Sequence, residues 1–212
     1  MQWLAPLLAV FAAYLVGSLA FAVIVSRAMG LSDPRTFGSR NPGATNVLRS
    51  GSKPAALVTL LLDAMKGFVP VMLVKHFGHR YGLDAGTMAM VGLAAFVGHL
   101  YPVFFRFQGG KGVATFIGVV FGIGWVLGVA TGLTWFIIAF FFRYSSLASL
   151  VAGVFAPVYY LLADRVMWYA DSRIATALFI MAMLLGWRHR ENISRLVAGK
   201  ESRLGQKKSA HP

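Results

Sequence analysis

Six apolar stretches, joined by short polar segments, constrain the fold of this chain more than any other feature of its sequence. They cover residues 3–25, 55–74, 86–105, 113–142, 147–163 and 174–187. A helix needs about 20 apolar residues to cross a hydrocarbon layer roughly 30 Å thick. Only 13% of the 212 residues are charged, whereas a soluble domain has about 25%. The sequence therefore predicts an all-α integral membrane protein.

The first and fourth stretches need interpretation. Residues 3–25 lack a basic start and exceed the roughly 7–15 apolar residues of a secretory signal, so we expect a retained first transmembrane helix. Residues 113–142 would form a helix of about 45 Å, which is too long for one modestly tilted span. Glycines at 122, 124, 128 and 132 are places where it can break. One span here makes six transmembrane helices in total, and two spans make seven.

The distribution of Lys and Arg decides between these counts. With seven spans, one side of the membrane receives five basic residues in the loop 27–53, then Arg106, Lys111 and Arg143, and seven more in the tail from Arg188. The other side receives only four, which are Lys75, Arg80, Arg165 and Arg173. Because basic segments stay in the cytoplasm, the sequence predicts seven transmembrane helices with the N-terminus outside and the C-terminus cytoplasmic. We expect one domain over residues 1–212, ending in a flexible basic tail of about ten residues.

Charge and composition also exclude some partners and cofactors. The net charge of +13 is concentrated in these segments, which favours membrane orientation and small anions over nucleic acid. The absence of cysteine excludes disulfides, thiol nucleophiles and cysteine-ligated metals. The few acidic residues are scattered and form no carboxylate cluster of the kind that binds magnesium. We therefore expect chemistry without a metal or other cofactor.

The segment 38–51 is rich in hydrogen-bonding side chains. Its glycines at 38, 43 and 51 permit tight turns and close approach to a ligand. Arginine side chains suit phosphate, because the planar guanidinium presents several fixed donors. The candidate binding residues are Ser39, Asn41, Thr45, Asn46 and Arg49. The alternative is a plain connecting loop whose arginines follow the positive-inside rule.

Three further sets of residues are candidates for binding or catalysis. Residues 108–115 predict a glycine-rich turn that opens a helix, where Gly109, Gly110 and Lys111 can attract an anion. His189 and Asn192 follow the last apolar stretch, where they can bind an oxyanion or transfer protons. Ser146 and Ser149 begin another helix, and capping is their default role.

Ionisable residues inside spans are expensive and usually face a polar interior. Asp63 and Lys66 lie three residues apart within one span, so they share a helical face. Either Asp63 orients Lys66 toward an anion, or the two form a structural ion pair. His99 is more often a packing residue than a ligand. The pattern His-x4-Asp at His79 and Asp84 is short enough to occur by chance, and the predicted topology places it on the side of the membrane opposite the other candidates, so we discount it.

Three segments together resemble one family. They are Gly38-Ser39-x-Asn41-Pro42-Gly43-Ala44-Thr45-Asn46-x-x-Arg49, then Gly109-Gly110-Lys111-Gly112-Val113-Ala114-Thr115, then His189-x-Glu191-Asn192-Ile193-x-Arg195-Leu196. Their order and content resemble the bacterial acyl-phosphate:glycerol-3-phosphate acyltransferase (PlsY) family, and the resemblance covers nearly the whole chain.

The resemblance implies an activity. Members transfer an acyl group from acyl phosphate to the 1-hydroxyl of glycerol 3-phosphate, giving 1-acylglycerol 3-phosphate (lysophosphatidic acid) and phosphate, which is the first acylation of phospholipid biosynthesis. They act in the bacterial cytoplasmic (inner) membrane, with the active site facing the cytoplasm, without a metal or acyl-CoA. A partner is the soluble enzyme that supplies acyl phosphate. The alternative from the residues alone is an organophosphate anion transporter.

The resemblance and the residue chemistry together assign hypothetical roles. Arg49 and Lys111 hold phosphates, with Lys66 as a weaker candidate. Ser39, His189 and Asn192 lie nearest the reacting groups. The pocket is shaped by Asn41, Thr45, Asn46, Gly109 and Gly110, and Ser146 and Ser149 bind glycerol 3-phosphate.

Overall fold

The computed structural model describes residues 3–205, which form an arrangement of α-helices. The elements are α1 (Leu4–Gly17), α2 (Phe21–Ala28), α3 (Ala44–Leu48), α4 (Lys53–Phe77), η1 (Gly78–Tyr81), α5 (Ala85–Leu100), η2 (Val103–Phe105), α6 (Val113–Ile123), α7 (Trp125–Phe142), α8 (Ser145–Leu162), α9 (Ser172–Arg188) and α10 (Arg190–Val197). Within this range, the extended pairing is a single isolated bridge between Asp164 and Trp168. The predicted all-α fold is confirmed for these residues. Most of the expected flexible tail lies outside them.

Among the described residues 3–205, four helical segments are long and apolar enough to cross a membrane: Lys53–Tyr81, Ala85–Phe105, α7 and α8. The pair α1 and α2 makes a fifth if it counts as one bent span. Helices α6 and α9 are shorter, with 11 and 17 residues. These lengths fit a membrane protein, and the count of seven spans remains a prediction.

The structure corrects the expectation of one continuous first helix. Helix α1 ends at Gly17, and α2 begins at Phe21 after a bend of 44°. At the bend the backbone packs closely against α5, because a Cβ on Gly17 would lie only 2.2 Å from the carbonyl oxygen of Ala95. Gly98 makes the reciprocal approach, with its Cβ position 2.4 Å from the carbonyl oxygen of Tyr14.

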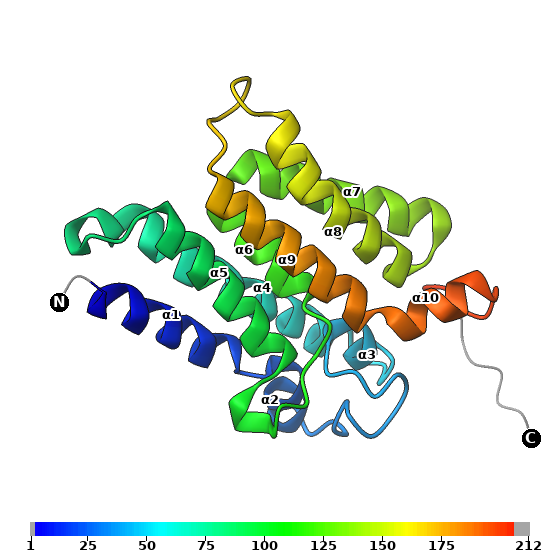
Figure 1. Ribbon diagram of the computed structural model, residues 1–212. Helices are drawn as coiled ribbons and strands as arrows, with labels where there is room; N and C mark the ends of the chain where they lie inside the picture. The colour runs from blue at the N-terminus through cyan, green and yellow to red at the C-terminus, as the bar shows by residue number, and fades with distance from the viewer. Residues whose placement is uncertain (1–2, 206–212) are drawn as a thin grey trace, which may run out of the picture.

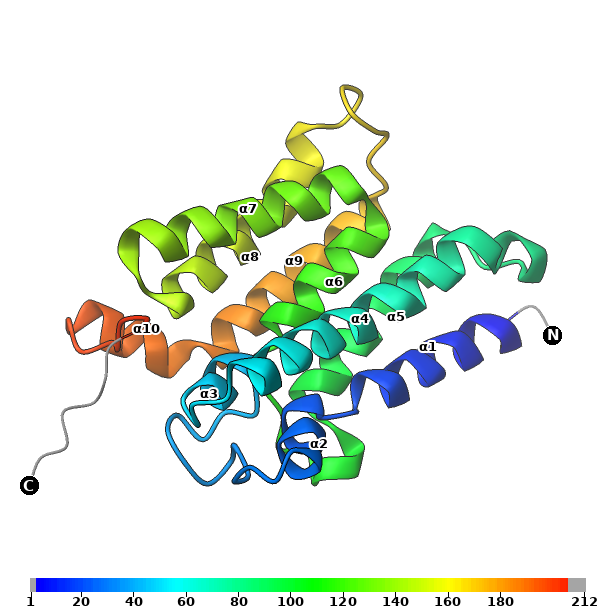
Figure 2. The same ribbon diagram turned by 180° about the vertical axis from the view of Figure 1, so that it is seen from behind.

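The long fourth stretch breaks at Gly124, one of the glycines at which a break was expected. Gly124 has an extended backbone, with φ −163° and ψ 131°, between α6 and α7. Gly128 then packs on Phe121, whose ring atoms lie 2.4 Å from its Cβ position. Figure 2 shows α7 turning away from the end of α6.

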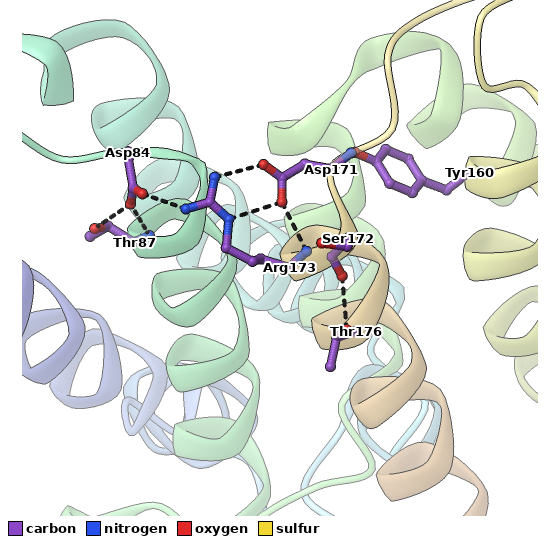
Figure 3. A network of polar contacts seen from close by, with 7 residues as sticks. All are labelled: Asp84, Thr87, Tyr160, Asp171, Ser172, Arg173 and Thr176. Carbon is purple, nitrogen blue, oxygen red and sulfur yellow. Dashed lines mark hydrogen bonds and ion pairs between the residues drawn. The ribbon is translucent and has the colours of Figure 1, made fainter.

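The connections between helices gather at two ends of the bundle. At one end lie residues 29–52 with α3, residues 101–112, the turn between α7 and α8, and α10 (Figures 1 and 2). We call it the motif end, because it carries the three sequence motifs. At the opposite end, Asp84 caps α5 through the Thr87 N–H (2.9 Å) and pairs with Arg173 of α9 (2.5 Å; Figure 3). Asp84 therefore has a structural role there.

Candidate functional site

The opening loop is folded around the buried side chain of Asn46 on α3. Its Nδ2 donates to the carbonyl oxygens of Pro34 (2.6 Å) and Phe37 (3.1 Å). Its Oδ1 accepts from the backbone N–H of Ser39 (3.0 Å). Gly38 has φ +59°, and a Cβ there would lie 2.3 Å from Asn46 Oδ1. Asn46 therefore fixes the path of the loop that carries Ser39.

The other candidate residues of this loop are more accessible. Ser39, Thr45 and Arg49 are exposed, and Asn41 is half-buried. Arg49 reaches the C-terminal segment, where its Nη2 donates to Ser202 Oγ (3.2 Å). The first motif and the segment around Ser202 are therefore neighbours in space.

The glycine-rich turn before α6 is clamped between α5 and α9. Arg188, the last residue of α9, donates from Nε to the Gly110 carbonyl (3.1 Å) and from Nη2 to the Gly109 carbonyl (2.8 Å). On the α5 side, the Gly110 N–H donates to the His99 carbonyl (3.1 Å). Neither glycine has room for a Cβ, which would lie 2.2 Å from His99 O at Gly109 and 2.2 Å from His99 Nε2 at Gly110.

Lys111 joins this turn to the start of α10. Its Nζ donates to Asn192 Oδ1, and Asn192 Nδ2 donates to Glu201 Oε1 (2.5 Å). Glu201 also accepts from Ser146 Oγ at the start of α8 (2.7 Å) and from Arg195 Nε (2.8 Å). Side chains from the second motif, the third motif and α8 thus meet in one cluster, which we call the Lys111 cluster.

Sequence reasoning missed Glu201. Burial alone would raise the pKa of this carboxyl, but hydrogen bonds from Asn192, Arg195 and Ser146 hold its pKa below the ordinary value. The cluster therefore holds a carboxylate anion. The one signal in the sequence is that Glu201 is the single acidic residue between Arg195 and the end of the chain.

Lys111 has an unusual acidity for a lysine. Burial lowers its pKa to about 8, helped by the positive charges of Arg195 and Arg188 and opposed by the carboxylates of Glu201 and Glu191. Desolvation disfavours the ammonium form, and a bound anion favours it. The cationic form of Lys111 is therefore sensitive to mildly alkaline pH.

His189 lies buried at the junction of α9 and α10, and its geometry defines its tautomer. Nδ1 lies 2.8 Å from the Leu185 carbonyl oxygen, which can only accept, so Nδ1 carries the proton. Burial is the main cause that lowers the pKa of His189 to about 4, and the charge of Lys111 contributes. The ring is therefore neutral at pH 7, with Nε2 as a proton acceptor.

Two predicted site residues lie apart from the Lys111 cluster. Ser149 is buried between α7 and α8, where it accepts from Trp135 Nε1 (3.1 Å). Lys66 is buried within α4, where its Nζ donates to the Leu19 carbonyl (2.7 Å) and pairs with Asp63 (2.8 Å). Within residues 3–205, no described hydrogen bond or ion pair joins Ser149 or Lys66 directly to that cluster.

A cavity of about 390 Å³ adjoins the glycine-rich turn. Its walls are Arg35, Arg40, Pro42, Phe107, Gln108, Gly109 and Arg188. Arg35 is paired with Asp33 (2.6 Å), while Arg40 adds an exposed positive charge. The cavity brings the first two motifs and α9 to one cationic surface.

The fold and the site define a class: a helical membrane protein with cationic and amide side chains gathered at one end of its bundle. The family model described as glycerol-3-phosphate acyltransferase matches residues 7–199, and the chain belongs to this family. The protein is therefore an acyltransferase of phospholipid biosynthesis. The family expected from the three motifs is confirmed.

Relatives match along almost the full chain. The glycerol-3-phosphate acyltransferase of Albidiferax ferrireducens is 65% identical over 207 residues, which cover 98% of this chain and 92% of that protein. That of Burkholderia pseudomallei is 61% identical over 204 residues, with 95% and 97% coverage.

Two solved structures share the fold. Both are crystal structures of PlsY (YgiH), an integral membrane glycerol 3-phosphate acyltransferase, and both cover 95% of this chain and 96% of their own. The glycerol 3-phosphate form has a TM-score of 0.86 at 39% identity, and the lysophosphatidic acid form has 0.85 at 38%. The prediction of an integral membrane protein is confirmed by this relationship.

Proposed function

We propose that this protein transfers an acyl group from acyl phosphate to the 1-hydroxyl of glycerol 3-phosphate, giving 1-acylglycerol 3-phosphate and inorganic phosphate. The observation that carries the proposal is the contact of Lys111 with Asn192, which joins the second motif to the third beside the neutral His189. Both substrates carry phosphate, so a cluster of cationic and amide donors suits them. The PlsY relatives, with their glycerol 3-phosphate and lysophosphatidic acid forms, support this choice of acceptor and product.

Each motif has a proposed role. Arg49 and Lys111 hold the substrate phosphates. Ser146, whose hydroxyl donates to Glu201 in the Lys111 cluster, serves the glycerol 3-phosphate side. Ser39, His189 and Asn192 lie nearest the reacting groups. The pocket is shaped by Asn41, Thr45, Asn46, Gly109 and Gly110.

The chemistry is a direct displacement. The acceptor hydroxyl attacks the acyl carbonyl carbon, the bond from that carbon to the phosphate oxygen breaks, and phosphate leaves with the electron pair. A substrate phosphate or His189 Nε2 accepts the hydroxyl proton. Because acyl phosphate is a mixed anhydride with a good leaving group, positioning and oxyanion stabilisation supply the acceleration without a cofactor or metal.

Ser39 serves as a hydrogen-bonding group and not as a nucleophile in this proposal. A Ser-His-Asp arrangement needs a carboxylate on the histidine Nδ1. Here Nδ1 of His189 contacts the Leu185 carbonyl (2.8 Å). Direct transfer between the substrates therefore fits the site better than an acyl-serine intermediate.

The membrane arrangement completes the proposal. The whole chain forms one domain of seven transmembrane helices, with the N-terminus outside the bacterial inner membrane. The motif end faces the cytoplasm, where glycerol 3-phosphate is available and where a soluble enzyme can deliver acyl phosphate. The excess of Lys and Arg in the segments of the motif end supports this orientation.

A donor comparison tests the function. Purified protein with glycerol 3-phosphate is expected to release phosphate and form lysophosphatidic acid from palmitoyl phosphate, and to form no product from palmitoyl-CoA. Rapid quenching is expected to reveal no acyl group on Ser39. Absence of phosphate release with palmitoyl phosphate contradicts the proposal, and efflux of entrapped glycerol 3-phosphate from proteoliposomes without donor supports a transporter instead.

The pH profile provides a second test. The ammonium form of Lys111 binds anions, and its pKa is about 8, so kcat/KM is expected to fall as pH rises through about 8. Because kcat/KM reports the free enzyme, kcat should fall at a higher pH, where bound phosphate has raised the pKa. Lys111→Arg should remove the alkaline fall, since guanidinium stays charged. An unchanged alkaline limb in Lys111→Arg means that another group titrates there.

A further inference from the structure

Three buried ionisable side chains form a network inside the bundle, outside the Lys111 cluster. They are Asp63 and Lys66 of α4 and His99 of α5, with exposures of 2%, 3% and 7%. Asp63 Oδ1 lies 2.8 Å from Lys66 Nζ and 3.5 Å from His99 Nδ1. One carboxylate oxygen thus links two helices.

The network ends at two irregular parts of the backbone. At one end, Lys66 Nζ donates to the Leu19 carbonyl (2.7 Å), at the bend between α1 and α2. At the other end, His99 holds Gly110 in two ways. Its carbonyl accepts from the Gly110 N–H (3.1 Å), and its ring Nε2 lies only 2.2 Å from the position of a Cβ on Gly110. The imidazole therefore packs directly against the backbone of the turn.

Stability alone does not account for this network. Replacing a buried ion pair by apolar residues of similar size is often neutral or stabilising, while removing one partner alone is strongly destabilising. In a membrane span, buried charges are especially costly and typically serve a function. The network connects the glycine-rich turn to the α1–α2 bend. It can therefore control where the turn lies relative to the bundle.

We infer that Asp63, Lys66 and His99 are positioning residues that set the place of the Gly109–Gly110 turn from inside the bundle. Asp63 orients the His99 ring, the ring fixes Gly110, and Gly110 precedes Lys111, which contacts Asn192. Lys66 acts through Asp63 instead of touching substrate. The consequence for turnover rests on the proposed function of Lys111, but the positioning itself does not.

A double replacement separates position from stability. Asp63→Leu/Lys66→Met removes both charges together, so we expect thermal stability close to that of the unmodified protein. The His99 ring loses its carboxylate partner, so hydrogen–deuterium exchange of residues 108–112 should become faster. By analogy with outer-shell partners of metal ligands, kcat/KM should fall roughly tenfold, mainly through KM for the phosphate substrates.

A matched control lies at the opposite end of α5. Asp84 and Arg173 form an ion pair between α5 and α9 (2.5 Å), far from the glycine-rich turn in the bundle (Figures 1 and 3). Asp84→Leu/Arg173→Met should leave both the exchange of residues 108–112 and the kinetics unchanged. Faster exchange of that turn in the control would mean a general loosening of α5 and would overturn the inference.

The other possible results of the exchange and kinetic measurements also decide for or against the inference. A stable Asp63→Leu/Lys66→Met variant with unchanged exchange and kinetics makes the network merely structural. A loss of turnover without faster exchange means direct action on substrate. If the double variant fails to fold, His99→Asn removes the imidazole ring that packs against Gly110, and it must show the faster exchange. Because exchange is measured without substrate, it tests the positioning even where the proposed reaction fails.

Discussion

Replacing Lys111 by Ala is expected to lower kcat/KM for the phosphate-bearing substrates by roughly 10²–10³-fold, the typical loss when one preorganised donor is removed. Lys111 lies in the turn before α6, half-buried, and the contact of its Nζ is with Asn192. Arg188 holds the same turn by its backbone carbonyls, so the turn should survive. The measurement is phosphate release at varied substrate concentration.

The matched control is Lys75→Ala. Lys75 is an exposed lysine near the end of α4, where its Nζ donates to the Ile123 carbonyl (2.7 Å). Its removal lowers the net charge of the protein by the same amount, away from the motif end. Kinetics close to those of the unmodified protein are expected. If Lys111→Ala behaves like Lys75→Ala, the phosphate role of Lys111 is wrong.

The parts of this structure that sequence could predict depend on local rules. Apolar length identified the helices, because the cost of exposing backbone in lipid does not depend on the rest of the fold. Lys and Arg counts grouped the three motifs on one side before any contact was known. The contact of Lys111 with Asn192 joins two of those motifs, and Arg188, the residue just before the third motif, contacts Gly109 of the second. A break at Gly124 could also be expected, because the backbone freedom of glycine is a property of the residue itself.

Other parts depend on neighbours that are distant in the chain. The bend after Gly17 requires the close approach of Ala95 on α5, which no local pattern reports. Glu201 looks like a solvated tail residue until Ser146 and Asn192 are placed beside it.

The direction in which a side chain points inside a span also depends on residues that are distant in the chain. Lys66 and Asp63 share a helical face in either interpretation of the sequence, as an anion site or as an ion pair. The choice between the two depends on whether a backbone carbonyl lies within reach. The bend between α1 and α2 supplies the carbonyl of Leu19, and that bend was itself not predicted.

Gly110→Ala is expected to lower kcat/KM by on the order of 10²-fold, because a displacement of about 1 Å in a positioned site can cost that much. The new Cβ would lie 2.2 Å from His99 Nε2, 2.9 Å from Cε1 of the same ring and 3.0 Å from the Pro42 carbonyl oxygen. The ring and the opening loop lie near the same Cβ position, so the turn must move. Lys111 follows Gly110 directly in the chain, so its contact with Asn192 should be disturbed.

Gly186→Ala on α9 is the control that separates displacement from the mere addition of a methyl group. Within residues 3–205, no heavy atom beyond Gly186 itself, its chain neighbours and its own helix backbone lies within 4 Å of its Cβ position. Alanine is favoured over glycine inside a helix by roughly 0.5–1 kcal/mol. Its thermal stability should be equal or higher, with unchanged kinetics. If Gly110→Ala also keeps its kcat/KM, then the turn tolerates movement and Lys111 does not depend on its position. A loss confined to Gly110→Ala, with the bundle still folded, instead makes the backbone of the turn part of the site.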